Sequence, residues 1–390
     1  MTLESIRKID WNDTQYSGNG VHNLHPYFAK FSPSIPYYII TSLSKRGAIV
    51  LDPYCGSGTT LVESKILGRN SIGIDANPIA CLISRVKTCD ISDDEIKAIK
   101  ETLRDLNTEI NFTYHDSKSK DTFFEKITIP EFHNRDYWFN KNVQYELAII
   151  SAKIKSLGSE KIKDILRLAL SRIIVKVSNQ QSESRYKRVL KKINNGESFR
   201  LFLEHVNNII INLLELRSLS DKETYVKVFN KDSREINFID TNTVDLIITS
   251  PPYLNSWDYG LYHKFRFRWL SMDLKDYEEK EIGKHLRRDG EVLERYKQDM
   301  YKCMQGFSKV LKSGGFCVIV NSNSIFKKKY VDTNEMIIGI AKKYGIQLVE
   351  TIDKKVYGPH FGLKASLISK KIANFGSSQK MEQILLFRKN

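Results

Sequence analysis

The stretch GAIVLDPYCGSGTTLVESKILGRNSIGID, residues 47–75, decides the fold. Its apolar run at 47–52 predicts a β-strand that ends in a turn containing two glycines. The pattern that follows predicts a helix over roughly 59–68, and residues 70–75 predict a second strand. Strand, helix and strand in this order form a βαβ unit with parallel strands. The turn before the helix is the position where an open α/β sheet binds a nucleotide-like ligand.

The turn itself narrows the class of ligand, and it reads Asp52-Pro53-Tyr54-Cys55-Gly56-Ser57-Gly58-Thr59-Thr60. It lacks the Gly-Lys-Ser/Thr of a phosphate-binding loop and the third glycine of a dinucleotide fingerprint. Asp75, 17 residues after Gly58, is placed to accept hydrogen bonds from both hydroxyls of a ribose. An adenosyl ligand without a pyrophosphate satisfies both observations. Alternatively, the glycines form an ordinary turn and Asp75 is a helix N-cap ahead of Pro78.

A second motif follows the β-branched run at 244–249, which predicts another strand and leads into Ser250-Pro251-Pro252-Tyr253. The two prolines cannot donate hydrogen bonds to a sheet, so they end the strand and leave its carbonyls free. A serine hydroxyl, a main-chain carbonyl and a tyrosine ring form a slot that accepts hydrogen bonds from an NH₂ group and stacks a heteroaromatic ring. Alone, such a tetrapeptide is more often a proline-rich loop with one packed tyrosine. Its pairing with the glycine turn favours the slot.

The chain divides into three blocks. Residues 1–90 contain the βαβ unit, and residues 223–390 contain further strands, the last of them expected to be antiparallel around 384–387. Residues 91–222 have few glycines or prolines and show apolar side chains at i, i+3 and i+4, which indicates helices. We therefore expect an α/β fold with a mainly parallel sheet and a helical insertion between its two parts.

Charge favours a polyanionic partner, because 61 Lys+Arg stand against 46 Asp+Glu, for a net charge of +15. Nucleic acid is the first partner to test. Residues 141–200 hold 14 Lys+Arg and 5 Asp+Glu, so much of the surplus lies in the insertion. Solvated helix faces would explain the same charge run without a partner.

Several classes of protein are not indicated. The five cysteines form no CxxC pair and are odd in number, so neither a disulfide framework nor a four-thiolate zinc site is expected. No stretch approaches the roughly 20 apolar residues of a membrane span, and the first residues have no apolar core of a signal peptide. We expect a cytoplasmic protein without membrane contact.

Together, residues 52–60, the stretch 68–80 (GRNSIGIDANPIA) and TSPPY at 249–253 resemble the S-adenosylmethionine-dependent amino-methyltransferases of DNA. That family carries an FxGxG-type cofactor motif and a (D/N/S)PP(Y/F) catalytic motif, and here Tyr54 replaces the usual phenylalanine. The resemblance implies a Rossmann-like class I methyltransferase core with S-adenosyl-L-methionine as cofactor. HPYFAKF at 25–31 resembles a further cofactor motif of the family, while the insertion is left unexplained.

The resemblance also implies roles for individual residues. Lys30 would help to hold the cofactor carboxylate, and Asp232 would face the adenine amino group. The implied cofactor-binding set is His25, Tyr27, Lys30, Phe31, Asp52, Pro53, Tyr54, Gly56, Ser57, Gly58, Thr59, Thr60, Asp75, Ala76, Asn77, Asp232 and Ser250. The implied catalytic set is Ser250, Pro251, Pro252 and Tyr253, and no metal is required.

The implied chemistry is methylation of an exocyclic amine. Hydrogen bonds from the target NH₂ to Ser250 Oγ and the Pro251 carbonyl would localise the nitrogen lone pair as the methyl group arrives, and Tyr253 would stack the base. A paired base cannot reach such a slot, so the target would be flipped out of the duplex. The enzymes that methylate carbon 5 of cytosine form another family, which uses a cysteine directly after a proline as nucleophile. No proline of this chain precedes a cysteine, so carbon-5 methylation is not expected.

Serine at the first position of the tetrapeptide resembles the cytosine-N4 enzymes, whereas aspartate or asparagine more often accompanies adenine-N6 methylation. We therefore expect N4 methylation of cytosine in double-stranded DNA, as the modification enzyme of a restriction-modification or related system. A cognate restriction enzyme is then an expected partner, by family habit. Adenine-N6 methylation is the alternative, and an RNA amino-methyltransferase or a non-catalytic nucleic-acid-binding protein are more remote ones.

The basic insertion is the best candidate for reading DNA sequence. Within it lies a polar stretch that either faces DNA or forms an interhelical loop, namely Ser178, Gln180, Gln181, Ser182, Ser184 and Arg185. The charged span 272–298 is a second candidate, more typical of a surface helix. Residues 254–259, after the tetrapeptide, are a plausible lid.

Overall fold

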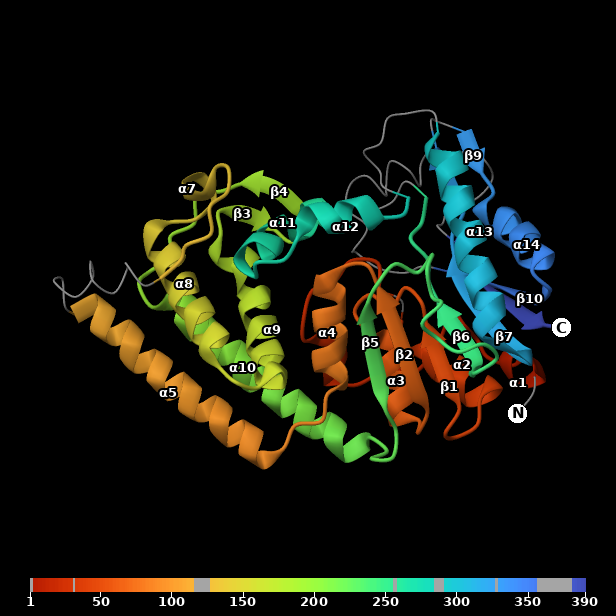
Figure 1. Cartoon of the computed structure of the whole chain (residues 1–390), viewed down its shortest axis with the longest axis horizontal. Helices are drawn as coiled ribbons and strands as arrows, with labels where there is room; N and C mark the ends of the chain where they lie inside the picture. The colour runs from red at the N-terminus through yellow and green to blue at the C-terminus, as the bar shows by residue number, and fades with distance from the viewer. Residues whose placement is uncertain are drawn as a thin grey trace.

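A seven-stranded sheet forms the core of one half of the molecule, with strand order β10-β11-β7-β6-β1-β2-β5 (Figure 1). The computed structural model describes residues 3–30, 32–115, 127–254, 258–283, 291–326, 329–355 and 381–390. The sheet strands are β1 (Ile49–Asp52), β2 (Asn70–Asp75), β5 (Val226–Asn230), β6 (Val244–Thr249), β7 (Leu311–Asn321), β10 (Ile346–Lys355) and β11 (Met381–Lys389).

Most neighbouring strands run parallel: β1 pairs with β2 and β6, β2 with β5, and β6 with β7. Strand β11 is antiparallel to both β7 and β10, so the predicted antiparallel last strand is confirmed. At the other edge, Ser71 to Asp75 of β2 lie in register with Val226 to Asn230 of β5. This mixed, mostly parallel α/β sheet is the expected Rossmann-like architecture.

Apolar residues on both faces of the sheet explain its burial. Leu51, Ile247 and Ile319 belong to one buried cluster, whereas their strand neighbours Val50 and Ile248 belong to another. Such alternation follows from the two-residue period of a strand. Helices α13 (Val292–Val310) and α14 (Thr333–Lys343) contribute to the first cluster. Helices α1 (Leu3–Arg7) and α2 (Ser34–Leu43) contribute to the second.

The βαβ unit forms as predicted. Helix α3 (Thr59–Ile66) connects β1 to β2, and α4 (Pro78–Thr88) follows β2. A short 3₁₀ helix, η1 (Gly20–Asn23), precedes the HPYFAKF segment. The small hairpin β8 (Ser324–Phe326) and β9 (Lys329–Val331) follows β7.

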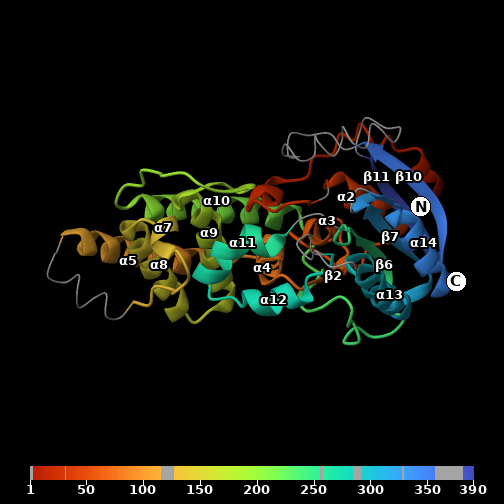
Figure 2. The same cartoon turned by 90° about the horizontal axis from the view of Figure 1, so that it is seen from above.

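The insertion is helical, as expected, and extends away from one end of the sheet (Figure 2). Its helices are α5 (Asp93–His115), α7 (Arg135–Trp138), α8 (Lys141–Ser156), α9 (Glu160–Val177) and α10 (Glu197–Leu219). One buried cluster joins Leu82 of α4, Leu166 of α9 and Phe265 of α11 (Tyr259–Trp269). The insertion therefore shares its core with helices on both sides of it in the sequence.

A hairpin that the sequence did not predict interrupts the insertion. It consists of β3 (Gln180–Ser182) and β4 (Arg185–Arg188), between α9 and α10. The polar stretch at 178–185 is thus neither a simple loop nor wholly exposed, since Ser178 and Gln180 are buried. Within the described residues, no helix is long and apolar enough to cross a membrane.

Candidate functional site

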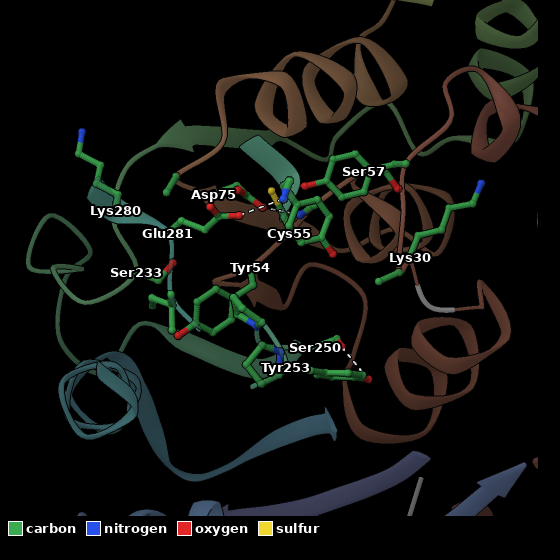
Figure 3. A pocket seen from close by; sticks show the side chains of 18 of the residues that line it. Lys30, Tyr54, Cys55, Ser57, Asp75, Ser233, Ser250, Tyr253, Lys280 and Glu281 are labelled. Carbon is green, nitrogen blue, oxygen red and sulfur yellow. Dashed lines mark hydrogen bonds between the residues drawn. The ribbon is translucent and has the colours of Figure 1, made fainter. Parts of the chain in front are cut away.

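A pocket lies where β1, β2 and β6 end (Figure 3). It brings together residues from the glycine turn, the end of β2, the HPYFAKF segment and the tetrapeptide, because parallel strands end at one edge of the sheet. The predicted residues that line it are Tyr27, Lys30, Tyr54, Gly56, Ser57, Thr59, Asp75, Ala76, Asp232, Ser250, Pro251, Pro252 and Tyr253.

Six predicted site residues do not line this pocket: His25, Asp52, Pro53, Gly58, Thr60 and Asn77. Phe31 lies outside the described residues. Most of the six support the pocket from behind, as the following contacts show.

Asp52 lies beneath the pocket and joins its two halves. The buried carboxylate accepts hydrogen bonds from Thr60 Oγ1 at 2.6 Å, Thr249 Oγ1 at 2.6 Å and the Tyr54 N–H at 3.2 Å. Burial raises the pKa of Asp52 to about 6. The carboxylate ties the start of α3 to the end of β6, so it fixes the glycine turn relative to the tetrapeptide.

The two glycines of the turn serve different purposes. Gly58 has φ +78°, and a Cβ there would lie 2.8 Å from Ser84 Oγ and 3.0 Å from Ser84 Cα of α4. Gly56 has φ +50°, and a Cβ there would lie 3.3 Å from Tyr27 Cε1 in the pocket wall. Ser84 Oγ also donates a hydrogen bond to the Gly56 carbonyl at 2.9 Å. Gly58 thus permits close packing of α4, whereas Gly56 lies at the pocket itself.

Asp75 presents a fixed carboxylate to the pocket. Its Oδ2 accepts the Gly56 N–H at 2.9 Å and its Oδ1 accepts the Asn77 N–H at 2.8 Å. Burial raises the pKa of Asp75 to about 6. The side chain of Asn77 caps α4 by accepting the Ile79 N–H at 2.9 Å, so the interpretation of Asp75 as the helix N-cap is wrong. Each Asp75 oxygen has further lone-pair capacity for a ligand.

Asp232 also lines the pocket, and an arginine holds it in place. Arg234 Nε lies 2.9 Å from Asp232 Oδ1, and Arg234 Nη2 lies 2.5 Å from Oδ2. The same guanidinium donates to Asp299 Oδ1 of α13 at 2.8 Å. Ser233 Oγ donates to the Pro53 carbonyl, which links this loop to the glycine turn. The orientation of the Asp232 carboxylate is therefore fixed by a fork of charge-assisted hydrogen bonds.

The tetrapeptide forms a short chain of hydroxyl groups. Ser250 Oγ donates to Tyr253 Oη at 3.2 Å, as the dashed line in Figure 3 shows. Tyr253 Oη lies 3.3 Å from Glu382 Oε1 of β11, to which it donates. Burial, followed by the charge of Glu382, raises the pKa of Tyr253 well above its ordinary value. The Tyr253 hydroxyl thus stays protonated and points toward β11, while the residue lines the pocket.

Sequence reasoning missed part of the pocket wall: Ala29, Cys55, Ser233, Tyr259, Tyr277, Lys280, Glu281 and Ile282. Glu281 Oε1 accepts hydrogen bonds from the Tyr259 N–H and the Tyr277 hydroxyl, both at 3.0 Å. Tyr27 stacks on Tyr259, with ring centroids 5.5 Å apart and planes 20° from parallel. Helix α12 (Leu274–Lys280) and the residues after it supply Tyr277, Lys280, Glu281 and Ile282 of this wall.

Two segments named in the sequence analysis therefore contribute more residues to the pocket than expected. Tyr259 ends the predicted lid 254–259, whose residues 255–257 lie outside the described part of the chain. The charged span 272–298, predicted as a surface helix, forms α12 and part of α13 and supplies pocket residues. Its residues 284–290 also lie outside the described part. The aromatic residues of both segments were the only local sequence signal that could have indicated a place in the pocket.

His25 lies behind the pocket, against the insertion. Its Nε2 is 2.9 Å from Ser171 Oγ of α9, and its Nδ1 is 2.8 Å from the Pro26 carbonyl oxygen. Burial lowers the pKa of His25 well below its ordinary value, and the nearby Arg266 acts in the same direction. His25 therefore connects the HPYFAKF segment to α9. Nearby, Lys30 Nζ donates to the His22 carbonyl at 2.8 Å.

Comparison with known proteins relates the chain to enzymes that modify DNA. A family model described as DNA methylase (N6_N4_Mtase) matches residues 4–85. The type II methyltransferase M.MjaII of Methanocaldococcus jannaschii is 23% identical over 448 residues, which cover 92% of this chain and 84% of that protein. M.MvaI of Kocuria varians is 24% identical over 421 residues, which cover 94% of this chain and 90% of that protein. M.BsoBI of Geobacillus stearothermophilus is 27% identical over 273 residues, which cover 65% of this chain and 53% of that protein. The family model and these relatives support a DNA amino-methyltransferase of the N4/N6 family.

Proposed function

We propose that this chain transfers a methyl group from S-adenosylmethionine to the exocyclic N4 amine of a cytosine flipped out of double-stranded DNA. The observation that carries the proposal is that Ser250 and the two prolines after it line the same pocket as Gly56 and Asp75. A donor and an acceptor held at these places would meet within one pocket, which is what methyl transfer between them requires.

The pocket residues fit an adenosyl cofactor with a methionine part. The Asp75 carboxylate, held by two backbone N–H groups, suits the hydroxyls of a ribose. Gly56 allows a ligand to approach the backbone beside Tyr27. Lys30 offers an ammonium group to a carboxylate, and Asp232 an acceptor to an amino group. When bound, S-adenosylmethionine supplies an activated methyl group on its sulfonium.

The hydroxyl chain supports a role for Ser250 as acceptor. Because Ser250 Oγ donates its own proton to Tyr253, its lone pairs are left to accept a hydrogen bond from the target amine. Such a bond draws the nitrogen lone pair out of conjugation with the ring and toward the incoming methyl group. Tyr253 lines the same pocket, and in this proposal its ring stacks the base.

The choice of cytosine N4 rests on the serine at position 250. Within the family that this chain resembles, the adenine-N6 enzymes more often have aspartate or asparagine at that position. The relatives are named type II methyltransferases. The proposal includes a place in a restriction-modification system, and a cognate nuclease as partner follows from family habit alone.

Nucleoside analysis tests the proposal. The purified protein is incubated with isotopically labelled S-adenosylmethionine and separate pools of duplex DNA and RNA, which are digested and analysed by mass spectrometry. Labelled N4-methylcytosine in DNA is the expected product. N6-methyladenine would keep the pocket assignment and overturn the specificity, whereas label confined to RNA would overturn the substrate.

A further inference from the structure

The positive charge of the insertion is unevenly neutralised. Some of its cations are paired, as in Lys153 with Glu109 at 3.0 Å and Arg200 with Glu204. Arg172 and Lys176 of α9 and Arg185 and Lys187 of β4 are among the cations that form no ion pair with any residue that the structure describes. The interpretation of the positive charge as solvated helix faces with paired charges therefore holds for only part of the insertion.

The unpaired cations of α9 continue a row that begins at the pocket. Lys30 lines the pocket, and its pKa is lowered by burial and by the charge of Arg172. Arg172 and Lys176 are four residues apart on α9 and so lie on one face. Both lower the pKa of His205 on α10, which burial together with these charges brings to about 4. The charge of Glu183 acts on Arg172 and that of Glu204 on His205, so acidic side chains balance part of this positive charge.

The β3–β4 hairpin is held firmly next to this row. Glu183 at its tip accepts two hydrogen bonds from Arg266 Nη2 of α11, at 2.7 and 2.9 Å. Arg266 is completely buried, and its Nε donates to the Ser171 carbonyl of α9 at 3.0 Å. In β4, Arg185 and Lys187 alternate with the half-buried Tyr186, so both project to solvent.

The hairpin and the pocket lie on one side of the molecule. Figure 1 shows β3, β4, α11 and α12 along the same upper edge, and the end of α12 contributes to the pocket. An extended row of exposed and half-buried cations that starts at a pocket wall fits a polymer of regularly spaced anions better than a small anion, which needs an enclosing site.

We propose that Arg172, Lys176, Arg185 and Lys187 form a basic track, next to Lys30 at the pocket, that binds the phosphate backbone of the DNA strand carrying the target base. The inference rests on the proposed function for the identity of the partner. Phosphate contacts of this kind set the position of the duplex and carry no sequence information themselves. The track places the strand so that a flipped nucleotide enters the pocket beside Lys30.

Salt-dependent binding tests the track. The triple variant R172Q/K176Q/K187Q is compared with a control, K141Q/K153Q/R200Q, which removes the same charge from cations that are already paired. Affinity for a fluorescent DNA duplex is measured by anisotropy between about 50 and 200 mM salt. Each lost phosphate contact should reduce the steepness of log K against log salt by about 0.9. In the triple variant the slope should therefore be smaller in magnitude by about 2 to 3.

The control should keep the slope of the unaltered protein. Equal losses in both triple variants would show an effect of net charge alone and overturn the track, as would an unchanged slope in R172Q/K176Q/K187Q. Calorimetry with S-adenosylmethionine checks that the pocket of each variant is intact. A duplex RNA of the same length that binds more tightly than DNA, with the same dependence on Arg172 and Lys176, would overturn the choice of DNA.

Binding and methylation are measured separately, so the two proposals fail in different ways. Methylated DNA with an unaltered slope in the track variant refutes the track and keeps the function. A reduced slope without any methylated nucleoside refutes the function and keeps the track as a DNA-binding surface.

Discussion

Replacing Gly58 by alanine should disturb both the fold and the pocket, and Gly47 provides the matched control. Both glycines have φ +78°, so alanine at either position costs about 1–2 kcal/mol of backbone strain. Alanine also restricts the unfolded chain, which returns about 0.4–1 kcal/mol. At Gly47 nothing lies within 4 Å of the added Cβ, so G47A should lose about 1 kcal/mol of unfolding free energy.

At Gly58 the added Cβ would meet Ser84 Cα at 3.0 Å, which is backbone of α4 and cannot rotate away. Overpacking of this kind adds about 1–3 kcal/mol, so G58A should lose about 2–4 kcal/mol. Because Ser84 Oγ donates to the Gly56 carbonyl, a displaced Ser84 should also weaken cofactor binding.

Urea unfolding of both variants measures the loss of stability, and calorimetry with S-adenosylmethionine measures the effect on the pocket. The difference between G58A and G47A isolates the clash, because the backbone strain is common to both. Equal losses in the two variants would refute the packing explanation. Unchanged cofactor affinity in G58A would refute the link from Ser84 to the turn.

Three further changes test other parts of the site. Ser250→Ala should lower turnover on the order of 10- to 100-fold with nearly unchanged cofactor affinity; full turnover would remove the hydroxyl from the mechanism. Since burial raises the pKa of Asp75 to about 6, its ionised fraction falls below that pH and cofactor affinity should fall with it. Asp75→Asn should bind weakly without this pH dependence, and equal affinity of the unaltered protein at about pH 5 and pH 8 would contradict the assignment. Arg266→Met should cost about 3 kcal/mol because it leaves the Glu183 carboxylate unpaired. Adding Glu183→Gln should recover part of that loss; a double variant as unstable as the single one would rule out the ion pair as the cause.

Local signals made much of the fold and site predictable. The β-branched runs of β1, β2 and β6 each end in a turn or proline signal, so the strands and their carboxyl ends could be placed from the sequence. Residues at these ends, such as Gly56, Asp75 and Ser250, meet because the strands are parallel neighbours. Strand β10 was missed, since its exposed edge carries several charged and polar side chains.

The residues that were missed depend on tertiary packing. Tyr277 and Glu281 reach the pocket only because α11 and α12 pack against the insertion and the HPYFAKF segment. The β3–β4 hairpin consists of short, polar strands without an alternating apolar pattern, so it resembles a loop in the sequence. His25 belongs to a predicted cofactor motif, yet its partner, Ser171, is 146 residues away in the chain.

The pairing of β2 with β5 bears on how proteins of this kind can diversify. The chain leaves the sheet after Asp75 and returns at Val226 to lie directly beside the strand it left. The entropy of closing such a long excursion depends only logarithmically on its length, and doubling it costs about 0.6 kcal/mol. Segments between these strands can therefore lengthen, shorten or be exchanged with little effect on the sheet, provided that the apolar contacts with α4 and α11 are kept. Under the proposed function, a change in the DNA-binding surface of these segments would leave the pocket at the edge of the sheet as it is.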